Sequence, residues 1–287
     1  MISHYIQLLR VKQWTKNLII FSGLVFSENL FNPLLIEKSA LAFILFCFLS
    51  SSIYIFNDLL DLENDRNHPL KKERPLPAGL ISVTNAAIFG VCIAISVLVL
   101  SYMLHKTFFN ICLIYFITFI LYSLFLKHVV ILDVLVISCG FVMRAIAGAV
   151  VIDVRYSPWF IICTFLLSLF LALAKRRHEL LLLNENATAH RRILEEYSPY
   201  FLDQMISVVT PSTMIAYTIY TLSPDAISHN LEYTVPFVMY GIFRYLYLVH
   251  QKGKGGSPEM ILLTDVPLII NILLWGSACV YIIYFLK

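Results

Sequence analysis

The sequence predicts an all-α membrane protein in which nine transmembrane helices form a single bundle. Of its 287 residues, 59% are hydrophobic and 14% are charged, and the mean hydropathy is +0.80. A chain with so few polar residues cannot cover the surface of a soluble globule of this size. Apolar stretches recur along the whole chain, each near the ~20 residues that a helix needs to cross the hydrocarbon of a membrane. Its six cysteines are scattered singly without a C-x-x-C pair, so neither a disulfide framework nor a zinc site is expected.

The spans are expected to follow a short N-terminal segment. Residues 1–12 mix apolar side chains with Gln, Arg and Lys and predict an interfacial helix, without the cleavage pattern of a signal peptide. The predicted spans cover residues 17–31, 35–57, 82–104, 108–126, 129–151, 158–174, 202–222, 233–250 and 263–286. We therefore expect one transmembrane domain, residues 1–287, with active-site loops at 58–81 and 175–200.

The basic residues divide unequally between the two sides of this topology. When the connections are assigned alternately, fifteen of the 21 Lys and Arg residues fall on the side of the N-terminus and four on the other, while Arg144 and Arg244 lie within spans. Cytoplasmic loops carry an excess of Lys and Arg. We therefore predict a protein of the cell inner membrane, with its N-terminus and active site in the cytoplasm and its C-terminus outside. The net charge of +3 comes from this rim, and no nucleic-acid motif is present.

The segment NDLLDLENDRNHPLKKERPLPAG, residues 57–79, joins the second and third predicted spans. Asp58, Asp61 and Asp65 recur at i, i+3 and i+7, the spacing that places side chains on one helical face. Three carboxylates on one face repel each other, so a cation is expected among them. Carboxylate oxygens, with Asn57 beside them, suit Mg²⁺ shared with the phosphates of a substrate. The pattern predicts a catalytic magnesium site.

Basic residues follow the acids closely, at Arg66, Lys71, Lys72 and Arg74. Acids followed by bases is the arrangement expected for a metal-bridged diphosphate whose remaining oxygens are bound by cations. A solvated loop between membrane helices would carry charges as well. Such a loop would not need the register of the three acids, or the Pro and Gly residues that shape the basic part.

Two more charged residues lie on the cytoplasmic side between the fourth and fifth spans. Lys127 ends the fourth span, where it is equally well explained as a positive-inside anchor. Asp133 lies just inside the fifth span. An acid within a membrane helix is costly unless a cation or a metal pairs with it, so we expect Asp133 near the site.

The loop after the sixth span opens with Lys175, Arg176 and Arg177, followed by Glu179. Three consecutive cations predict direct binding of phosphate. The alternative is a basic girdle that contacts anionic lipid.

Two polar residues deeper in the chain have structural explanations. Arg144 lies ~16 Å beyond Asp133 at ~1.5 Å per residue, well into the bilayer. It could line a substrate path, or it could pair with Asp153 or with helix-end carbonyls. Asp265 is expected to cap the last helix or to pair with Arg244.

Several of these motifs together resemble the UbiA superfamily of intramembrane prenyltransferases. Asn57, Asp58, Asp61 and Asp65 match its first aspartate-rich motif, N-D-x-x-D-x-x-x-D. The continuation H-P-x-K-x-x-R-P is more similar to the branch of decaprenyl-phosphate phosphoribosyltransferases. Its matching residues are His68, Pro69, Lys71, Arg74 and Pro75. The resemblance extends through RVKQWTKN (10–17), FVMRAIAGA (141–149) and LALAKRRHE (171–179).

The resemblance implies a UbiA-like fold and a magnesium-dependent transfer of phosphoribose. The donor would be 5-phosphoribosyl 1-diphosphate (PRPP) and the acceptor a polyprenyl phosphate in the membrane. Mg²⁺ on Asp58, Asp61 and Asp65 would neutralise the departing diphosphate, while the acceptor phosphate attacks ribose C1 without a protein nucleophile. The remaining substrate-binding residues would be Asn57, Arg66, His68, Lys71, Arg74, Lys127, Asp133, Lys175, Arg176, Arg177 and Glu179, with Lys16 and Asn17 at the acceptor head group or at the membrane interface.

Two other functions stay open at this point. A conventional prenyltransferase would use the same first motif, but the superfamily generally has a second acid cluster where this chain has Lys175, Arg176 and Arg177. A transporter of lipid-linked phosphates would distribute charges through the depth of the membrane, whereas nearly all of them lie at one face here.

Overall fold

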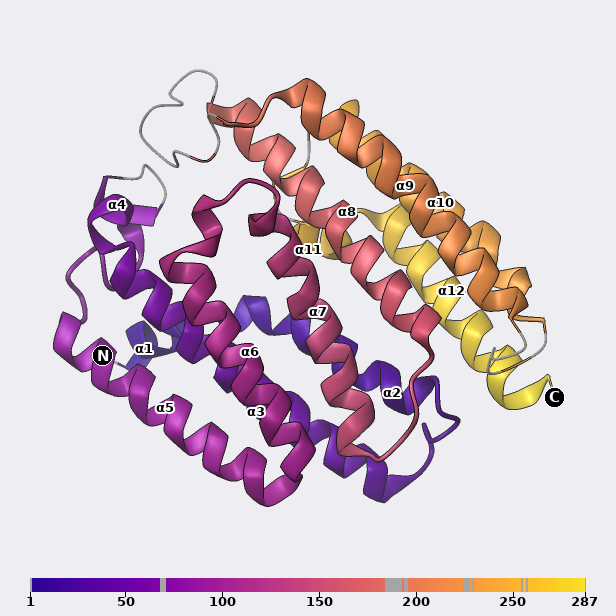
Figure 1. The fold of residues 1–287 in the computed structure, drawn as a ribbon, viewed down its shortest axis with the longest axis horizontal. Coiled ribbons are helices and arrows are strands. Elements are labelled where there is room, and N and C mark those ends of the chain that lie inside the picture. The colour runs from indigo at the N-terminus through magenta and orange to yellow at the C-terminus, as the bar shows by residue number, and fades with distance from the viewer. Residues whose placement is uncertain are drawn as a thin grey trace.

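The computed structural model is a bundle of long helices (Figure 1). It describes residues 2–67, 71–183, 193, 196–223, 228, 230–253, 255–256 and 258–286. The α-helices are α1 (Ile2–Leu8), α2 (Ser22–Val25), α3 (Pro33–Leu60), α4 (Leu62–Arg66), α5 (Val83–Leu104), α6 (Lys106–Leu124), α7 (Leu132–Val151), α8 (Pro158–Leu183), α9 (Pro199–Leu222), α10 (Val235–His250), α11 (Pro258–Thr264) and α12 (Val266–Phe285). The 3₁₀ helices are η1 (Val11–Phe21), η2 (Lys71–Glu73), η3 (Leu126–His128) and η6 (Leu231–Thr234).

Seven helices among the described residues are long and apolar enough to cross a membrane: α3, α5, α6, α7, α8, α9 and α12. Nine spans were predicted, and the other two correspond to shorter elements. The predicted span 17–31 is divided between η1 and α2, and α2 ends at Val25. The polar stretch that follows includes Glu28, which adopts a positive φ of 61°. The predicted span 233–250 contains α10, which has 16 residues and follows η6.

Side chains at the helix starts explain where several long helices begin. The Asn32 side chain accepts hydrogen bonds from the first backbone N–H groups of α3, and Ser82 does the same for α5. His105 Nδ1 accepts from Phe108 N at 3.2 Å at the start of α6. Such caps satisfy N–H groups that have no partner within the helix. Asp265 caps α12 and also binds the Arg244 guanidinium at 2.9 and 3.1 Å, so both sequence-based explanations of Asp265 are confirmed.

A buried arginine holds η1 against the middle of the bundle. Arg144 of α7 donates from Nε to Asn17 Oδ1 at 2.7 Å and from Nη2 to the hydroxyl of Tyr115 at 2.5 Å. The pairing of Arg144 with Asp153 considered from the sequence is wrong, because the carboxylate of Asp153 contacts His105 at 3.1 Å instead. The nearby Gly148 is a required glycine, since a Cβ at this position would lie 1.9 Å from the carbonyl oxygen of Ile20.

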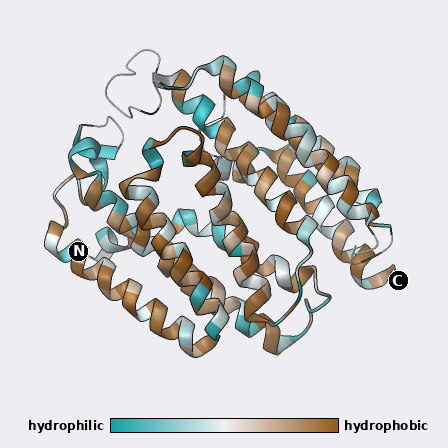
Figure 2. Cartoon of the chain, viewed as in Figure 1, coloured by the Kyte–Doolittle hydropathy of each residue, from teal (hydrophilic) through white to brown (hydrophobic). Residues whose placement is uncertain are grey.

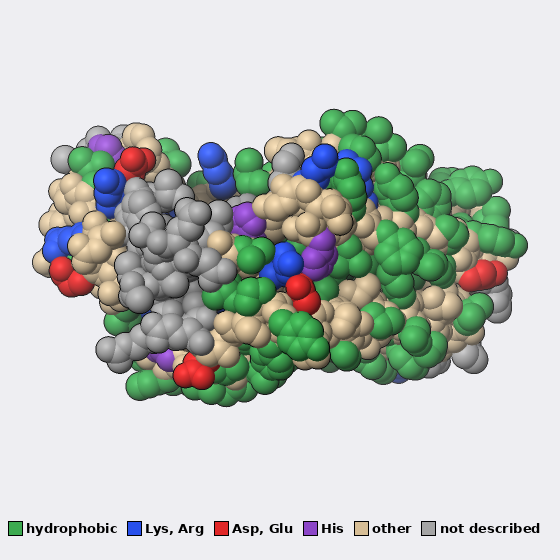
Figure 3. Space-filling model, turned by 90° about the horizontal axis from the view of Figure 1, so that it is seen from above, with side chains coloured by type: hydrophobic (Ala, Val, Ile, Leu, Met, Phe, Trp, Pro, Cys, Tyr) green, Lys and Arg blue, Asp and Glu red, His purple; other side chains and the backbone are tan. Residues whose placement is uncertain are grey.

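The flanks of the bundle are apolar, and the charged side chains gather at one end. Large hydrophobic side chains in the middle of the long helices, such as Ile95 of α5 and Leu273 of α12, are exposed, as expected for a surface that faces lipid. Figure 2 shows hydrophobic residues along the long helices and hydrophilic residues at α4. The connection between α6 and α7, the end of α8 and the start of α9 lie at the same end of the bundle as α4 (Figure 1). Figure 3 looks onto this end and shows Lys, Arg, Asp, Glu and His side chains there.

Candidate active site

The acidic segment continues the helical hydrogen-bond register beyond the end of α3. Asp61 stands between α3 and α4, with φ −94° and ψ 10°. Its N–H still donates to the carbonyl of Asn57 at 2.9 Å, and the N–H of Asp65 donates to the carbonyl of Asp61 at 2.8 Å. Asp58 and Asp65 are each 2% exposed. The segment thus buries two of its three aspartates.

One guanidinium joins these two buried acids. Arg74 Nη1 donates to Asp65 Oδ2 at 2.8 Å and to Asp58 Oδ1 at 3.1 Å. Lys71 Nζ lies 3.4 Å from Asp65 Oδ1. Both cations come from the basic half of the loop. Gly79 ends this half with a φ of 72°, a backbone conformation that residues with a side chain rarely adopt. The basic half of the loop therefore returns onto its acidic half.

Two cations from distant parts of the chain complete this group. Arg10, between α1 and η1, donates from Nη2 to Asp58 Oδ1, and its guanidinium carbon lies 5.0 Å from the centre of the Tyr54 ring. Lys127 of η3 donates from Nζ to Asp61 Oδ1 at 2.6 Å. The acid cluster is defined as Asp58, Asp61, Asp65, Arg10, Lys71, Arg74 and Lys127.

The cations of the acid cluster are crowded. Burial and then the neighbouring guanidinium of Arg10 lower the pKa of Arg74 from its ordinary value, because a desolvated cation beside another cation is less stable. Arg74 nevertheless stays protonated, since a guanidinium loses its proton only far above neutral pH. Arg74 therefore contributes a positive charge to the acid cluster at neutral pH.

The carboxylates of the acid cluster have the chemistry of a magnesium site but do not form a complete one by themselves. No group of three or more His, Cys, Asp or Glu side chains within the described part of the chain is arranged to hold a metal. Asp58 and Asp65 do converge on one positively charged nitrogen, Nη1 of Arg74. Mg²⁺ prefers oxygen ligands and often completes its coordination with substrate phosphates. These carboxylates therefore fit Mg²⁺ together with oxygens of a bound substrate.

A second cluster joins α7 to α8. Arg176 Nη2 lies 2.8 Å from Asp133 Oδ2, and Arg176 Nη1 donates to Glu179 Oε2 at 2.6 Å. The hydroxyl of Tyr197 donates to Asp133 Oδ1 at 2.8 Å and accepts from the N–H of Ile131 at 2.7 Å. Asp133 is fully buried and Arg176 is 4% exposed. The expectation that Asp133 pairs with a cation is confirmed.

Within this second cluster the guanidinium of Arg176 is already paired with acids. Burial, reinforced by the hydrogen bond to Asp133, raises the pKa of Tyr197, so its hydroxyl remains a donor at neutral pH. Two carboxylates share the guanidinium of Arg176. The positive charge of Arg176 is therefore already shared between two carboxylates before any phosphate binds.

Three of the predicted substrate-binding residues have other partners. Arg177 forms a two-bond contact with Asp203 of α9, at 2.5 and 3.2 Å. Arg66 binds the exposed Glu63 at 2.7 Å. Asn17 is fully buried against Arg144. In the described parts of the molecule, none of the hydrogen bonds and ion pairs of these three side chains joins them to the acid cluster or to the second cluster.

The remaining predicted residues lie nearer the surface. Asn57 is partly buried and precedes Asp58 in the last turn of α3. Lys16 and Lys175 are partly exposed, and each interacts with neighbouring residues. His68 lies outside the described residues.

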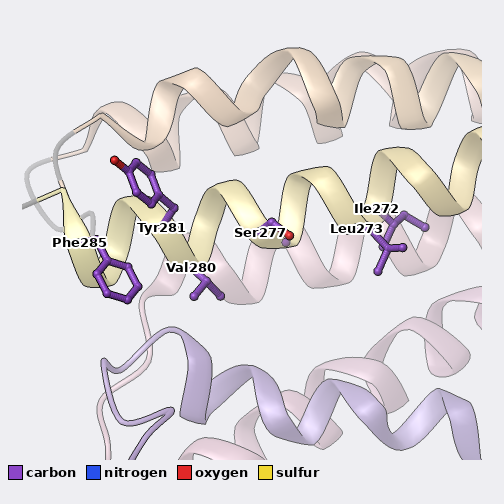
Figure 4. A pocket seen from close by; sticks show the side chains of 7 residues that line it. Ile272, Leu273, Ser277, Val280, Tyr281 and Phe285 are labelled. Carbon is purple, nitrogen blue, oxygen red and sulfur yellow. The ribbon is translucent and has the colours of Figure 1, made fainter.

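Sequence reasoning did not identify the pairing of Arg10 with Asp58 or the roles of Tyr197 and Asp203. These contacts join residues that are 48, 64 and 26 positions apart, and no local pattern indicates them. A separate apolar groove of about 490 Å³ runs along α12 (Figure 4) and is lined by Ile272, Leu273, Gly276, Ser277, Val280, Tyr281 and Phe285. None of these residues is charged, so the groove provides no cation for a phosphate.

Comparison with known proteins gives relatives for almost the whole chain. The profile of the UbiA prenyltransferase family matches residues 18–257. A decaprenyl-phosphate phosphoribosyltransferase of Corynebacterium glutamicum is 33% identical, over 97% of this chain and 86% of that protein. A decaprenyl-phosphate phosphoribosyltransferase of Mycolicibacterium smegmatis is 31% identical, over 99% of this chain and 94% of that protein.

The fold is also similar to that of a solved structure. A UbiA homolog from Archaeoglobus fulgidus, bound to GPP and Mg²⁺, superposes with a TM-score of 0.76 at 18% identity, over 98% of this chain and 99% of that one. At this identity the likeness concerns the fold alone. The all-helical bundle, the match to the family profile and the full-length relatives agree, and the chain therefore belongs to the UbiA prenyltransferase family.

Proposed function

We propose that this protein transfers the 5-phosphoribosyl group from PRPP to a polyprenyl phosphate, giving polyprenyl-phosphoryl-ribose 5-phosphate and diphosphate. The observation that carries this proposal is the similarity, over 97% and 99% of the chain, to two proteins named decaprenyl-phosphate phosphoribosyltransferase. The acid cluster supports it, because cations and carboxylates are interleaved there as a metal-bound diphosphate requires.

In this proposal the acid cluster binds the diphosphate of the donor. Asp58, Asp61 and Asp65 would hold Mg²⁺ together with diphosphate oxygens, and the bound ion would supply positive charge to the leaving group. Arg74 and Lys71 would donate to the remaining diphosphate oxygens, because their side-chain nitrogens already contact Asp65, one of the proposed metal ligands. These residues act by placing positive charge where negative charge develops as the bond to ribose C1 breaks.

The acceptor needs no general base in this reaction. A polyprenyl phosphate is already ionised at neutral pH, so its oxygen can attack C1 once it is oriented. Lys16 and Lys175 are partly exposed cations. We assign these two lysines to the two remaining phosphates, the acceptor phosphate and the 5-phosphate of the donor. Lys127 would hold Asp61 in place, since its Nζ is only 2.6 Å from that carboxylate.

A second candidate is the transfer of a prenyl chain from a prenyl diphosphate. It is favoured by the similarity to the Archaeoglobus fulgidus structures bound to GPP or DMAPP with Mg²⁺. The segment after the middle of α8 argues against it. Lys175, Arg176 and Arg177 stand there, where the prenyltransferases of the superfamily generally have a second acid cluster.

We further propose nine crossings of the inner membrane, with the acid cluster at the cytoplasmic face. The continuous stretch of η1 and α2 has 11 and 4 residues. At ~2.0 Å per residue in a 3₁₀ helix and ~1.5 Å in an α-helix it spans about 28 Å, close to the ~30 Å of the hydrocarbon. The stretch of η6 and α10 has 4 and 16 residues. The whole chain would then be one transmembrane domain, with its active-site segments at residues 58–81 and 175–200. The second segment was predicted as a loop, but it begins within α8, which continues to Leu183.

The test is a comparison of donors with the purified protein in detergent or vesicles. Polyprenyl phosphate is supplied with PRPP and Mg²⁺, and the lipid product is analysed by mass spectrometry. We expect the lipid to gain one phosphoribosyl unit and diphosphate to be released. A parallel reaction contains a prenyl diphosphate with an aromatic acceptor. A prenylated product there, with no ribosylated lipid from PRPP, would favour the second candidate.

A further inference from the structure

Arg10 reaches the acid cluster from an unusual backbone conformation. Its φ of 52° and ψ of 49° lie in the left-handed region, which residues with side chains rarely adopt. The side chain passes over the ring of Tyr54 and ends at the carboxylate of Asp58, one helical turn further along α3. Arg10 thus belongs spatially to the aspartate motif, although it lies 48 residues from Asp58 in the sequence.

One carboxylate oxygen is shared by two arginines. Asp58 Oδ1 accepts from Arg10 Nη2 and from Arg74 Nη1. Asp58 is one of the residues that we assign to Mg²⁺, and a metal ion bound at this oxygen would face two guanidinium groups at close range. Like charges so close together in a buried site repel each other strongly. Metal binding at this oxygen therefore requires at least one of the two arginines to find another partner.

The charge of the acid cluster supplies the reason for such a change of partner. Asp58, Asp61 and Asp65 give three negative charges, and Arg10, Lys71, Arg74 and Lys127 give four positive charges. The ligand-free cluster is therefore net positive and repels a divalent cation. A diphosphate brings both negative charge and hydrogen-bond acceptors for guanidinium groups.

We propose that Arg10 is a diphosphate-binding residue that blocks metal binding at Asp58 until a diphosphate arrives. The guanidinium then exchanges the carboxylate of Asp58 for an oxygen of the diphosphate, and the freed carboxylate binds the metal. Metal and diphosphate thus bind as a coupled pair, each weakly without the other. The inference rests on the proposed function, because it takes the diphosphate of the donor as the ligand.

Metal binding itself, measured without turnover, tests this proposal. Radioactive Mn²⁺ serves as the probe in equilibrium dialysis of the solubilised protein, with and without inorganic diphosphate. For the wild type we expect binding of Mn²⁺ to tighten at least about tenfold when diphosphate is present. For Arg10→Gln we expect Mn²⁺ alone to bind about tenfold more tightly than to the wild type, and the gain from diphosphate to shrink by a similar factor. Arg10→Lys keeps the charge and should behave more like the wild type.

Arg155→Gln is the matched control. It removes the same charge from an exposed position between α7 and α8, and it should leave binding of Mn²⁺ unchanged in both conditions. If Arg10→Gln binds Mn²⁺ alone no better than the wild type while diphosphate still tightens binding, the role of Arg10 is refuted and the proposed function stands. If the wild type binds no Mn²⁺ with either diphosphate or PRPP, the metal site of the proposed function fails as well.

Discussion

Arg176 and Arg177 are neighbours in the sequence but lie in different surroundings. Arg176 is 4% exposed and binds Asp133 and Glu179, whereas Arg177 binds the partly exposed Asp203. Removing one member of a buried ion pair costs ~3–5 kcal/mol, because the partner is left as an uncompensated charge. A pair near the surface contributes ~1 kcal/mol or less. The two arginines therefore differ mainly in their contribution to stability.

We expect Arg176→Gln to lower the free energy of unfolding by ~3 kcal/mol or more, and Arg177→Gln by ~1 kcal/mol or less. Thermal unfolding of the detergent-solubilised variants measures the difference. Equal shifts for the two variants would contradict the arrangement of the second cluster. Because Arg177→Gln should remain folded, its KM for PRPP also tests directly whether Arg177 contributes to phosphate binding, as its place in the sequence predicted.

The acids of the motif segment also divide by their surroundings. Asp58 is buried against two arginines, while the side chain of Glu63, in the same segment, is 80% exposed. We expect Asp58→Asn to lower kcat at least about a hundredfold, because it removes a negative ligand from the proposed metal site. Glu63→Gln makes a matched change from acid to amide and should keep the activity of the wild type. Steady-state assays with PRPP and polyprenyl phosphate measure both, and comparable losses would mean that the segment acts only through its overall charge.

At the scale of helices, the contact between α7 and η1 determines where the N-terminal segment lies. A Cβ on Gly148 would come 1.9 Å from the carbonyl oxygen of Ile20, whereas a Cβ on Gly276 of α12 would meet no atom within 4 Å. Overpacking costs ~1–3 kcal/mol, and more where backbone must move. We expect Gly148→Ala to lower the unfolding temperature clearly. It should also reduce activity, because η1 begins directly after Arg10 and a shift of η1 would displace Arg10 from the acid cluster. Gly276→Ala should change neither quantity, and a tolerated Gly148→Ala would refute the close approach.

Unbroken apolar stretches between polar or Pro-containing segments were enough to predict the long helices. The 3₁₀ geometry of η1 was not predictable, since the same apolar residues can form an α-helix or a 3₁₀ helix. Within the site, the return of Arg74 onto Asp58 was predictable because both belong to one loop. The pairing of Arg10 with Asp58 and the capture of Arg176 by Asp133 depend on tertiary packing. The run Lys175, Arg176 and Arg177 therefore suggested three cations for phosphate binding, whereas the fold pairs Arg176 and Arg177 with carboxylates.

For the molecule as a whole, stability and activity should respond differently to removal of metal. In the ligand-free protein the carboxylates of the acid cluster are compensated by internal cations, Arg74 and Lys127 among them. We therefore expect excess chelator to abolish turnover while leaving the thermal unfolding temperature of the ligand-free protein nearly unchanged. Calorimetry and product assays on the same sample measure both effects. Full activity in chelator would refute the metal assignment, and unfolding on chelation would show that the ion also holds the fold together.

The number of crossings determines on which side of the membrane the C-terminus lies. Seven helices are long enough to cross by themselves, and the proposal of nine adds the stretch of η1 and α2 and the stretch of η6 and α10. If one of these two stretches did not cross, the number would be even and both termini would lie on the same side. We expect a fusion of alkaline phosphatase to the C-terminus to be active and a fluorescent protein there to be dark, because the predicted C-terminus is outside. The same reporters fused after Lys72 should give the opposite result, since that residue lies in the loop of the acid cluster. Identical behaviour of the two fusion sites would mean that the stretch of η6 and α10, which lies between them in the chain, does not cross the membrane.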